Sequence, residues 1–197
     1  MYEVKNICLF ASSSERLEPK YYALAQALGR AIASAGAGLV FGGGQLGLMG
    51  AAARGAAQKG GCVTGVIPTL LNRPGVAYAD CTTLHETPTM HARKQMMEDL
   101  SDAFIALPGG FGTLEEVLEV ITLKQLGYHD KPIVLLNMDG FFDPLLEQFE
   151  QLFATGFAHV AYRALYATAD TPEEAVNLIL THTPCVLPDK LQDAKLK

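Results

Sequence analysis

Residues 39–50, LVFGGGQLGLMG, join a short apolar run to a glycine-rich turn and to the start of an alanine-rich helix. Gly42, Gly44 and Gly47 match the pattern G-x-G-x-x-G in the strand–turn–helix setting that this motif requires. Glycines let the backbone approach an anion closely, and the amides at a helix N-terminus carry partial positive charge. We therefore predict a strand followed by an anion site, with a tight turn that needs positive φ as the structural alternative.

The same alternation of strand and helix patterns extends along the chain. Uninterrupted apolar runs, typical of parallel strands buried on both faces, occupy residues 7–10, 39–41, 63–67, 103–107 and 133–136. Apolar side chains recur at helical spacing between these runs, for example at Tyr21, Leu24, Leu28 and Ile32. Further helix starts are typical at Asp143-Pro144 and Thr171-Pro172.

This alternation predicts an α/β fold, a Rossmann-like doubly wound parallel sheet with helices on both faces. We expect a single domain over residues 1–185 and a loose C-terminal tail at 186–197. In such folds, ligands bind at the carboxyl ends of the strands, so the functional residues should follow the apolar runs.

Composition excludes several functions. The chain has 197 residues with 15 basic and 21 acidic side chains, a formal net charge of −6, and no basic cluster, which argues against nucleic-acid binding. The uncharged stretch at 31–53 contains seven glycines that would break a membrane helix, so we predict no membrane segment. Four widely spaced cysteines predict a reduced cytoplasmic protein without a metal site, with Cys8 and Cys62 in the core.

The region after the first glycine turn argues against a dinucleotide cofactor. A Rossmann dinucleotide site needs an acidic residue about 20 positions after the glycines, where it binds a ribose hydroxyl. Residues 60–75, GGCVTGVIPTLLNRPG, contain no acidic side chain. We therefore expect no NAD, and no other cofactor is indicated.

A second glycine-rich turn, PGGFGTLEE at residues 108–116, follows the apolar run at 103–107. Two such turns at separate strand ends predict a mononucleotide held between them, with its phosphate at a helix start. Glu115 and Glu116 would then lie in the first helical turn, where a carboxylate could reach the sugar. The structural alternative is a capping box, with Thr113 as N-cap and Glu116 folding back onto it.

Arg93 falls on the apolar stripe of a helix that we predict over residues 89–100, three residues after Met90 and four before Met97. Thr89 is a suitable N-cap for this helix, and Lys94 lies beside the arginine. A charged group that faces the core needs a partner, and guanidinium binds carboxylates and phosphates through paired hydrogen bonds. The alternative is snorkelling, in which the Arg93 methylenes cover the core while the head group stays in water.

The segments GGGQLGLMG, MHARKQMM, SDAFIALPGGFGTLEEVLEVIT and KQLGYHDKPIVLLNMDGFF together resemble the LONELY GUY (LOG) family of cytokinin riboside 5′-monophosphate phosphoribohydrolases. The likeness extends over residues 4–157. It implies a homodimer whose catalytic residues are Arg93 and Glu116. It also implies that a nucleoside 5′-monophosphate is bound by Ser12, Gly43, Gly44, Met90, Lys94, Gly109, Gly110, Phe111, Gly112, Thr113, Glu115 and Thr122.

The resemblance implies hydrolysis of the N-glycosidic bond of cytokinin riboside 5′-monophosphates, and of AMP, to free base and ribose 5-phosphate. Glu116 would stabilise an oxocarbenium-like transition state and orient water, while Arg93 would lower the pKa of Glu116. Departures include Phe10-Ala11-Ser12-Ser13 after the first strand, Phe111 for a common tyrosine and Leu123 for a common tryptophan. The alternatives are an AMP nucleosidase of purine salvage and a non-catalytic nucleotide or cofactor carrier.

Overall fold

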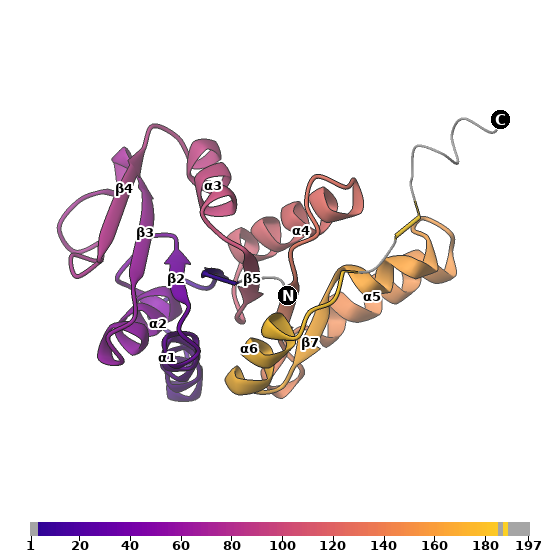
Figure 1. The fold of residues 1–197 in the computed structure, drawn as a ribbon, viewed down its shortest axis with the longest axis horizontal. Helices are drawn as coiled ribbons and strands as arrows, with labels where there is room; N and C mark the ends of the chain where they lie inside the picture. The colour runs from indigo at the N-terminus through magenta and orange to yellow at the C-terminus, as the bar shows by residue number, and fades with distance from the viewer. Residues whose placement is uncertain (1–3, 185–186, 189–197) are drawn as a thin grey trace.

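The computed structural model describes residues 4–184 and 187–188, and in this part of the chain seven parallel strands form one sheet. Their order is β4-β3-β2-β1-β5-β6-β7 (Figure 1). The strands are β1 (Asn6–Phe10), β2 (Gly38–Phe41), β3 (Val63–Pro68), β4 (Thr83–Thr87), β5 (Ala103–Ala106), β6 (Ile133–Leu136) and β7 (Ala167–Ala169). The predicted doubly wound parallel sheet is confirmed.

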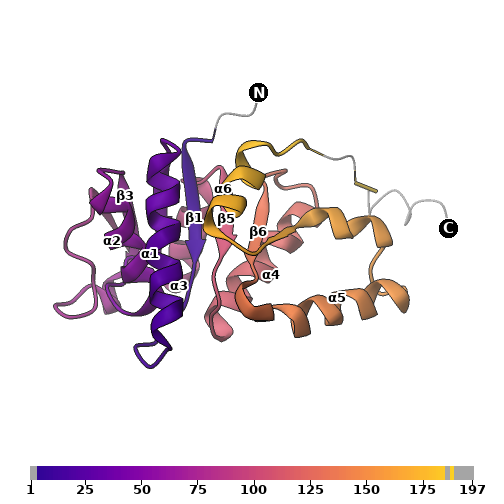
Figure 2. The ribbon, with the colours of Figure 1, turned by 90° about the horizontal axis from the view of Figure 1, so that it is seen from below.

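Helices connect the strands and cover both faces of the sheet. The α-helices are α1 (Pro19–Ser34), α2 (Gly47–Gln58), α3 (Met90–Asp99), α4 (Phe111–Gln125), α5 (Asp143–Ala154) and α6 (Pro172–Leu180). The 3-10 helices are η1 (Thr69–Leu71), η2 (Met138–Gly140) and η3 (Val160–Leu165). One apolar cluster lies under α1, α2 and α6, and a second lies under α3, α4, α5 and η3 on the opposite face (Figures 1 and 2).

The winding direction reverses at β1, which pairs with β2 on one side and β5 on the other. Residues after these strands therefore meet at the topological switch point, where α/β sheets bind their ligands. All five predicted strands are present, whereas β4 and β7 were missed. These two are edge strands: Thr83, Leu84 and Glu86 of β4 are exposed, and β7 has only three residues, so neither carries a buried apolar run.

The helix starts follow the predicted capping chemistry with one shift. The hydroxyl oxygen of Thr171 accepts a hydrogen bond from the amide of Glu174, as expected of an N-cap. Helix α5 begins at Asp143 itself, one residue earlier than predicted, with Phe142 as N-cap. Asp143 does not act as the cap, because its Oδ1 accepts from Asn137 Nδ2 at 2.7 Å, and Asn137 Oδ1 accepts from the amide of Phe142.

One cysteine and the C-terminal tail need comment against the sequence-based expectations. Cys62, which is predicted to lie in the core, is exposed because it precedes β3, whose first residue is Val63. Most of the predicted tail at 186–197 lies outside the described residues, although Leu187 packs against the cluster under α4 and α5. No helix in the described ranges is long and apolar enough to cross a membrane.

Helices α1 and α2 pack backbone to backbone through two glycines. A Cβ atom on Gly29 would overlap the carbonyl oxygen of Ala52, and one on Gly55 would overlap the carbonyl oxygen of Gln26. The helices lie side by side in both views (Figures 1 and 2). Because α2 leads directly out of the first glycine turn, this contact also fixes that turn against the sheet.

We expect Gly29→Val to lower the free energy of unfolding by about 3 kcal/mol, because the side chain must push the two helices apart. Ala23→Val on the exposed face of α1 is the matched control and should cost about 0.5 kcal/mol through helix propensity alone. Urea denaturation followed by circular dichroism measures both. Equal losses would contradict the close packing of α1 and α2.

Candidate functional site

A cavity of about 570 Å³ opens at the carboxyl ends of β1, β2, β3 and β5, at the switch point of the sheet. The residues that line it come from segments far apart in sequence. The lining residues are Ala11, Ser12, Ser13, Ser14, Gly42, Gly44, Leu46, Met49, Ile67, Leu71, Val76, Met90, Arg93, Gly110, Phe111, Gly112, Thr113 and Glu116. Both glycine-rich turns and the unusual arginine therefore face one space.

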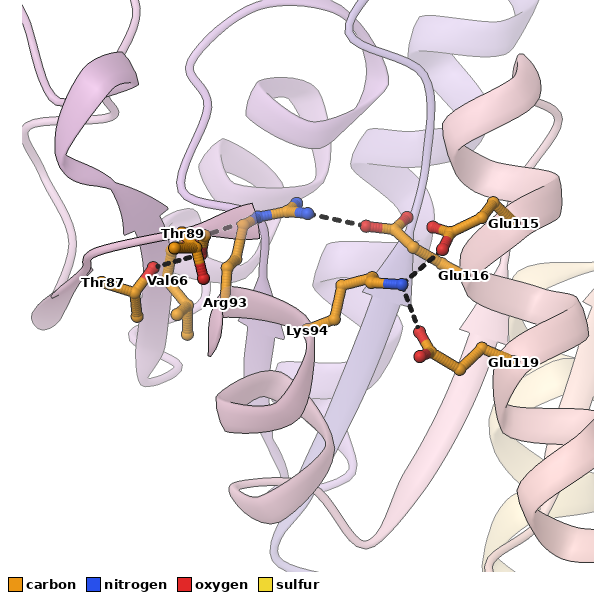
Figure 3. A network of polar contacts seen from close by, with 8 residues as sticks. All are labelled: Val66, Thr87, Thr89, Arg93, Lys94, Glu115, Glu116 and Glu119. Atoms are coloured by element: carbon orange, nitrogen blue, oxygen red, sulfur yellow. Dashed lines mark hydrogen bonds and ion pairs between the residues drawn. The ribbon is translucent and has the colours of Figure 1, made fainter. Parts of the chain in front are cut away.

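Helix α3 presents Arg93 to this cavity one turn after its start. The predicted N-cap is present, since Thr89 Oγ1 accepts from the amide of Ala92 at 3.1 Å. The buried hydroxyl of Thr87 donates to the carbonyl oxygen of Thr89 at 3.2 Å and anchors the cap to the end of β4 (Figure 3). The entry of α3, and with it the position of Arg93, is thus fixed by short-range hydrogen bonds.

Arg93 forms a buried ion pair with Glu116 of α4. Its Nη1 donates to Glu116 Oε1 at 2.8 Å, and its Nε donates to the carbonyl oxygen of Val66 at 3.2 Å (Figure 3). The two side chains are only 8% and 10% exposed. Snorkelling of Arg93 is therefore wrong, and pairing with a glutamate is confirmed.

Gly42 provides the space that the Arg93 guanidinium occupies. A Cβ atom built on Gly42 would fall on Arg93 Nη2, and Met49 Sδ would lie 3.2 Å away. The absence of a side chain at this position of the G-x-G-x-x-G motif thus accommodates a protein cation. This steric reason differs from the anion contact that the motif predicted.

Glu116 lies deeper in its helix than the sequence indicated. Helix α4 begins at Phe111 with Gly110 as N-cap, so Thr113 is inside the helix and caps nothing through its side chain. The capping box between Thr113 and Glu116 is therefore wrong: the Glu116 carboxylate bonds Arg93 instead of folding back. A Cβ atom on Gly109 would overlap the Thr113 side chain, which explains the glycine there.

Burial controls the acidity of Glu116. Desolvation raises its pKa above the usual carboxyl value, and the positive charge and hydrogen bond of Arg93 oppose this rise. Arg93 does lower the pKa, as expected, but burial outweighs it, so the net direction is upward. The carboxylate is poised to exchange a proton closer to neutrality than a surface glutamate.

The two glycine-rich turns differ in the backbone amides that they leave open. At the start of α2, the amides of Leu48 and Met49 both donate to the carbonyl oxygen of Ser12, at 2.9 and 3.4 Å. At the start of α4, the amides of Phe111, Gly112 and Thr113 have no acceptor among the described residues. The second turn therefore leaves all three of its first helical amides open to an anion, whereas the first turn has two of its three bonded to the protein itself.

Comparison with known proteins decides the family. A family model described as possible lysine decarboxylase matches residues 49–179. A probable cytokinin riboside 5′-monophosphate phosphoribohydrolase of Oryza sativa subsp. japonica is 42% identical over 91% of this chain and 79% of its own length. A cytokinin riboside 5′-monophosphate phosphoribohydrolase of Rhodococcoides fascians is 43% identical over 89% of both chains. The chain belongs to the LOG family.

A solved structure extends the likeness to a protein that is described by a different role. The molybdenum cofactor binding protein from the phototrophic bacterium Rippkaea orientalis has a TM-score of 0.69 and 27% identity, covering 92% of this chain and 98% of that one. The LOG fold is thus shared with a protein described as binding a cofactor. Among the described residues of the LOG chain, no group of His, Cys, Asp and Glu could hold a metal ion.

The LOG site brings together most of the predicted residues but not all of them. The cavity is lined by both catalytic candidates and by Ser12, Gly44, Met90, Gly110, Phe111, Gly112 and Thr113. Five candidates do not line it: Gly43, Lys94, Gly109, Glu115 and Thr122. Lys94 and Glu115 pair with each other, and the Thr122 hydroxyl donates to the carbonyl oxygen of Leu118 on its own helix.

The apolar wall of the LOG cavity was not among the features predicted from the sequence. It is formed by Leu46, Met49, Ile67, Leu71 and Val76. Part of it comes from the segment after β3, which is tied to the first glycine turn by backbone hydrogen bonds. The amide of Gln45 donates to Val76 and that of Tyr78 donates to Gly43, both at 2.8 Å. These are long-range backbone contacts without a side-chain pattern, so only the fold reveals them.

We expect Gly42→Ala to destabilise the protein by about 2 kcal/mol, because its methyl group must displace the buried guanidinium of Arg93. In an Arg93→Ala background the same substitution should cost less than about 1 kcal/mol, since the obstructing atoms are gone. A double-mutant cycle of unfolding free energies measures this coupling. Additive losses would contradict the assignment of Gly42 as the space that seats Arg93.

Proposed function

We propose that this chain is a cytoplasmic phosphoribohydrolase that cleaves the N-glycosidic bond of cytokinin riboside 5′-monophosphates, and of AMP, to release the free base and ribose 5-phosphate. The observation that carries the proposal is the buried Arg93–Glu116 pair beside the open amides at the start of α4. The names of relatives that are 42% and 43% identical over most of the chain support the same activity.

The phosphate is assigned to the N-terminus of α4. The three open amides belong to Phe111, Gly112 and Thr113, which line the cavity, and the helix dipole adds partial positive charge there. No carboxylate lies in the first turn of α4, since Glu115 and Glu116 come after it. The prediction that Glu115 and Glu116 lie in the first helical turn is therefore wrong, and neither carboxylate lies among the open amides.

Glu116 is assigned to the sugar. Arg93 holds its Oε1, whereas Oε2 has no hydrogen-bond donor among the described residues and is left for water. Water attacks C1′ while the N-glycosidic bond breaks and its electron pair leaves with the base. The water loses one proton and the base gains one, so the reaction balances without a cofactor. A carboxylate beside C1′ stabilises the positive charge that develops on the sugar.

The base is assigned to the apolar wall. Leu46, Met49, Ile67, Leu71 and Val76 offer contact area but no charge, which suits a purine and an apolar substituent on its N6. AMP would fill less of this wall than a prenylated nucleotide. The ratio of kcat/KM for the two substrates measures how much of the discrimination the wall supplies.

A non-catalytic carrier is the alternative, and the molybdenum cofactor binding protein from Rippkaea orientalis gives it a precedent within the fold. Two observations favour the hydrolase. That protein is 27% identical to this chain, against more than 40% for the phosphoribohydrolases. A carrier of an anionic ligand also gains nothing from a buried carboxylate in its binding cavity, since the charge repels the ligand.

We expect the wild-type protein to release free base and ribose 5-phosphate from AMP and from N6-isopentenyl-AMP, as followed by liquid chromatography. Glu116→Gln should lower kcat by about 1,000-fold or more while retaining nucleotide affinity, because the amide cannot stabilise the oxocarbenium charge. Glu147→Gln on the exposed face of α5 is the matched control and should behave as wild type.

Tight nucleotide binding without base release from either substrate would overturn the hydrolase and favour the carrier. Near-wild-type turnover in Glu116→Gln would leave the activity in place but remove the carboxylate from its mechanism.

A homodimer is the second part of the proposal. Phe111 and Leu118 of α4 and Leu126, which directly follows it, are 93%, 41% and 44% exposed. Met90 of α3 is 51% exposed and lines the same cavity as Phe111. Large apolar side chains exposed on neighbouring elements are typical of an interface. Because Phe111 and Met90 also line the cavity, a second copy on this face would cover the mouth of the site.

We expect Leu118→Glu to convert a dimer to a monomer in size-exclusion chromatography with light scattering, because a charge would be buried in the apolar contact. Leu180→Glu, on α6 at the opposite face of the sheet, introduces the same charge at a residue of similar exposure and should leave the dimer intact. A monomeric wild-type protein, or a Leu118→Glu dimer, would contradict the proposed interface.

A further inference from the structure

Lys94 is bound by carboxylates of the neighbouring helix instead of facing the cavity. Its Nζ pairs with Glu115 and, at 2.7 Å, with Glu119, one turn further along α4. The Lys94 side chain is only 14% exposed, whereas its partners Glu115 and Glu119 are 58% and 29% exposed, so the contact lies at the edge of the protein surface. In Figure 3 the ammonium group lies between the two carboxylates.

This contact lies directly beside the Arg93–Glu116 pair. Arg93 and Lys94 are consecutive on α3, and their partners Glu115 and Glu116 are consecutive on α4 (Figure 3). Neighbouring side chains on a helix point in directions about 100° apart, so one pair meets the cavity and the other lies behind it. Two adjacent cationic side chains of α3 thus pair with carboxylates of α4.

We propose that Lys94 is a positioning residue: by holding Glu115 and Glu119, it fixes the rotation of α4 that brings the Glu116 carboxylate onto Arg93. The proposal rests on the function assigned above, in which Glu116 acts on the sugar. It replaces the expectation that Lys94 binds the nucleotide. Glu115, which pairs with Lys94, has the same indirect role.

Electrostatics gives this arrangement a measurable signature. Three charged groups act on Glu116: Arg93 and Lys94 lower its pKa, whereas Glu115 raises it. Removing Lys94 leaves the Glu115 and Glu119 charges uncompensated, so the pKa of Glu116 should rise further. If Glu116 must be ionised, activity on the acid side should then be lost at a higher pH than in the wild type.

Glu98 is a second titrating group in this network and must be separated from Glu116. Burial and the nearby charge of Glu119 raise the pKa of Glu98 to about 7, and Lys131 and Lys94 oppose that rise. Its titration could imitate a shift of Glu116 in a pH profile. Glu98→Gln removes this group without touching the Arg93–Glu116 pair, and all pH profiles are therefore measured in that background.

The test compares Lys94→Met with the conservative Lys94→Arg, using N6-isopentenyl-AMP as substrate. We expect Lys94→Met to lower kcat by about tenfold with KM changed by less than about twofold, and to move the acid limb up by about half a pH unit. Lys94→Arg should restore both properties, because it keeps the charge and reaches both carboxylates. Thermal unfolding confirms that each variant is folded.

Two outcomes would overturn the proposal. A rise in KM with unchanged kcat would return Lys94 to nucleotide binding. A loss of kcat with an unmoved acid limb and no rescue by Lys94→Arg would reduce its role to general stability. The 13C carboxyl resonance of Glu116 gives its pKa without any turnover. If the wild-type protein is inactive but Lys94→Met still shifts the pKa of Glu116, the proposed function is refuted and the positioning role of Lys94 stands.

Discussion

The buried ion pair between Arg93 and Glu116 is the contact on which the rest of the site depends. Removing two charges from water costs several kcal/mol per ion, and their attraction repays this only with good geometry and further hydrogen bonds. The structure supplies both through the Val66 carbonyl, the space left by Gly42 and the anchored start of α3. Each of these features stabilises a charge at a position where burial disfavours charged groups.

This constraint explains why the two glycine-rich turns serve different purposes. In the turn after β2, the amides of Leu48 and Met49 are bonded to Ser12, and the Arg93 guanidinium fills the space beside Gly42. This turn therefore forms the wall against which the cation packs. The turn after β5 leaves its amides open and delivers Glu116 from the same helix. One turn therefore supports the catalytic pair, and the other combines an anion site with a carboxylate one and a half turns away.

Most of the fold could be predicted from the sequence, because five strands are continuous apolar runs. Arg93 could be predicted as a site residue, because it interrupts an otherwise apolar helical stripe. The sequence could not predict that Gly42 makes room for Arg93, since a glycine in such a motif is equally consistent with an anion contact. The capping box failed for a related reason: Thr113 and Glu116 have the right spacing, but Gly110 starts the helix earlier. The apolar wall around Leu71 and Val76 depends on long-range backbone contacts that leave no local pattern.

A crystal structure of Glu116→Gln with bound AMP tests the central claim most directly, because it locates phosphate, sugar and base in one experiment. The account predicts phosphate oxygens within hydrogen-bond distance of the amides of Phe111, Gly112 and Thr113, with C1′ beside residue 116 and the base on the apolar wall. A phosphate bound instead on the turn at residues 42–47, with the sugar remote from Arg93, would contradict it.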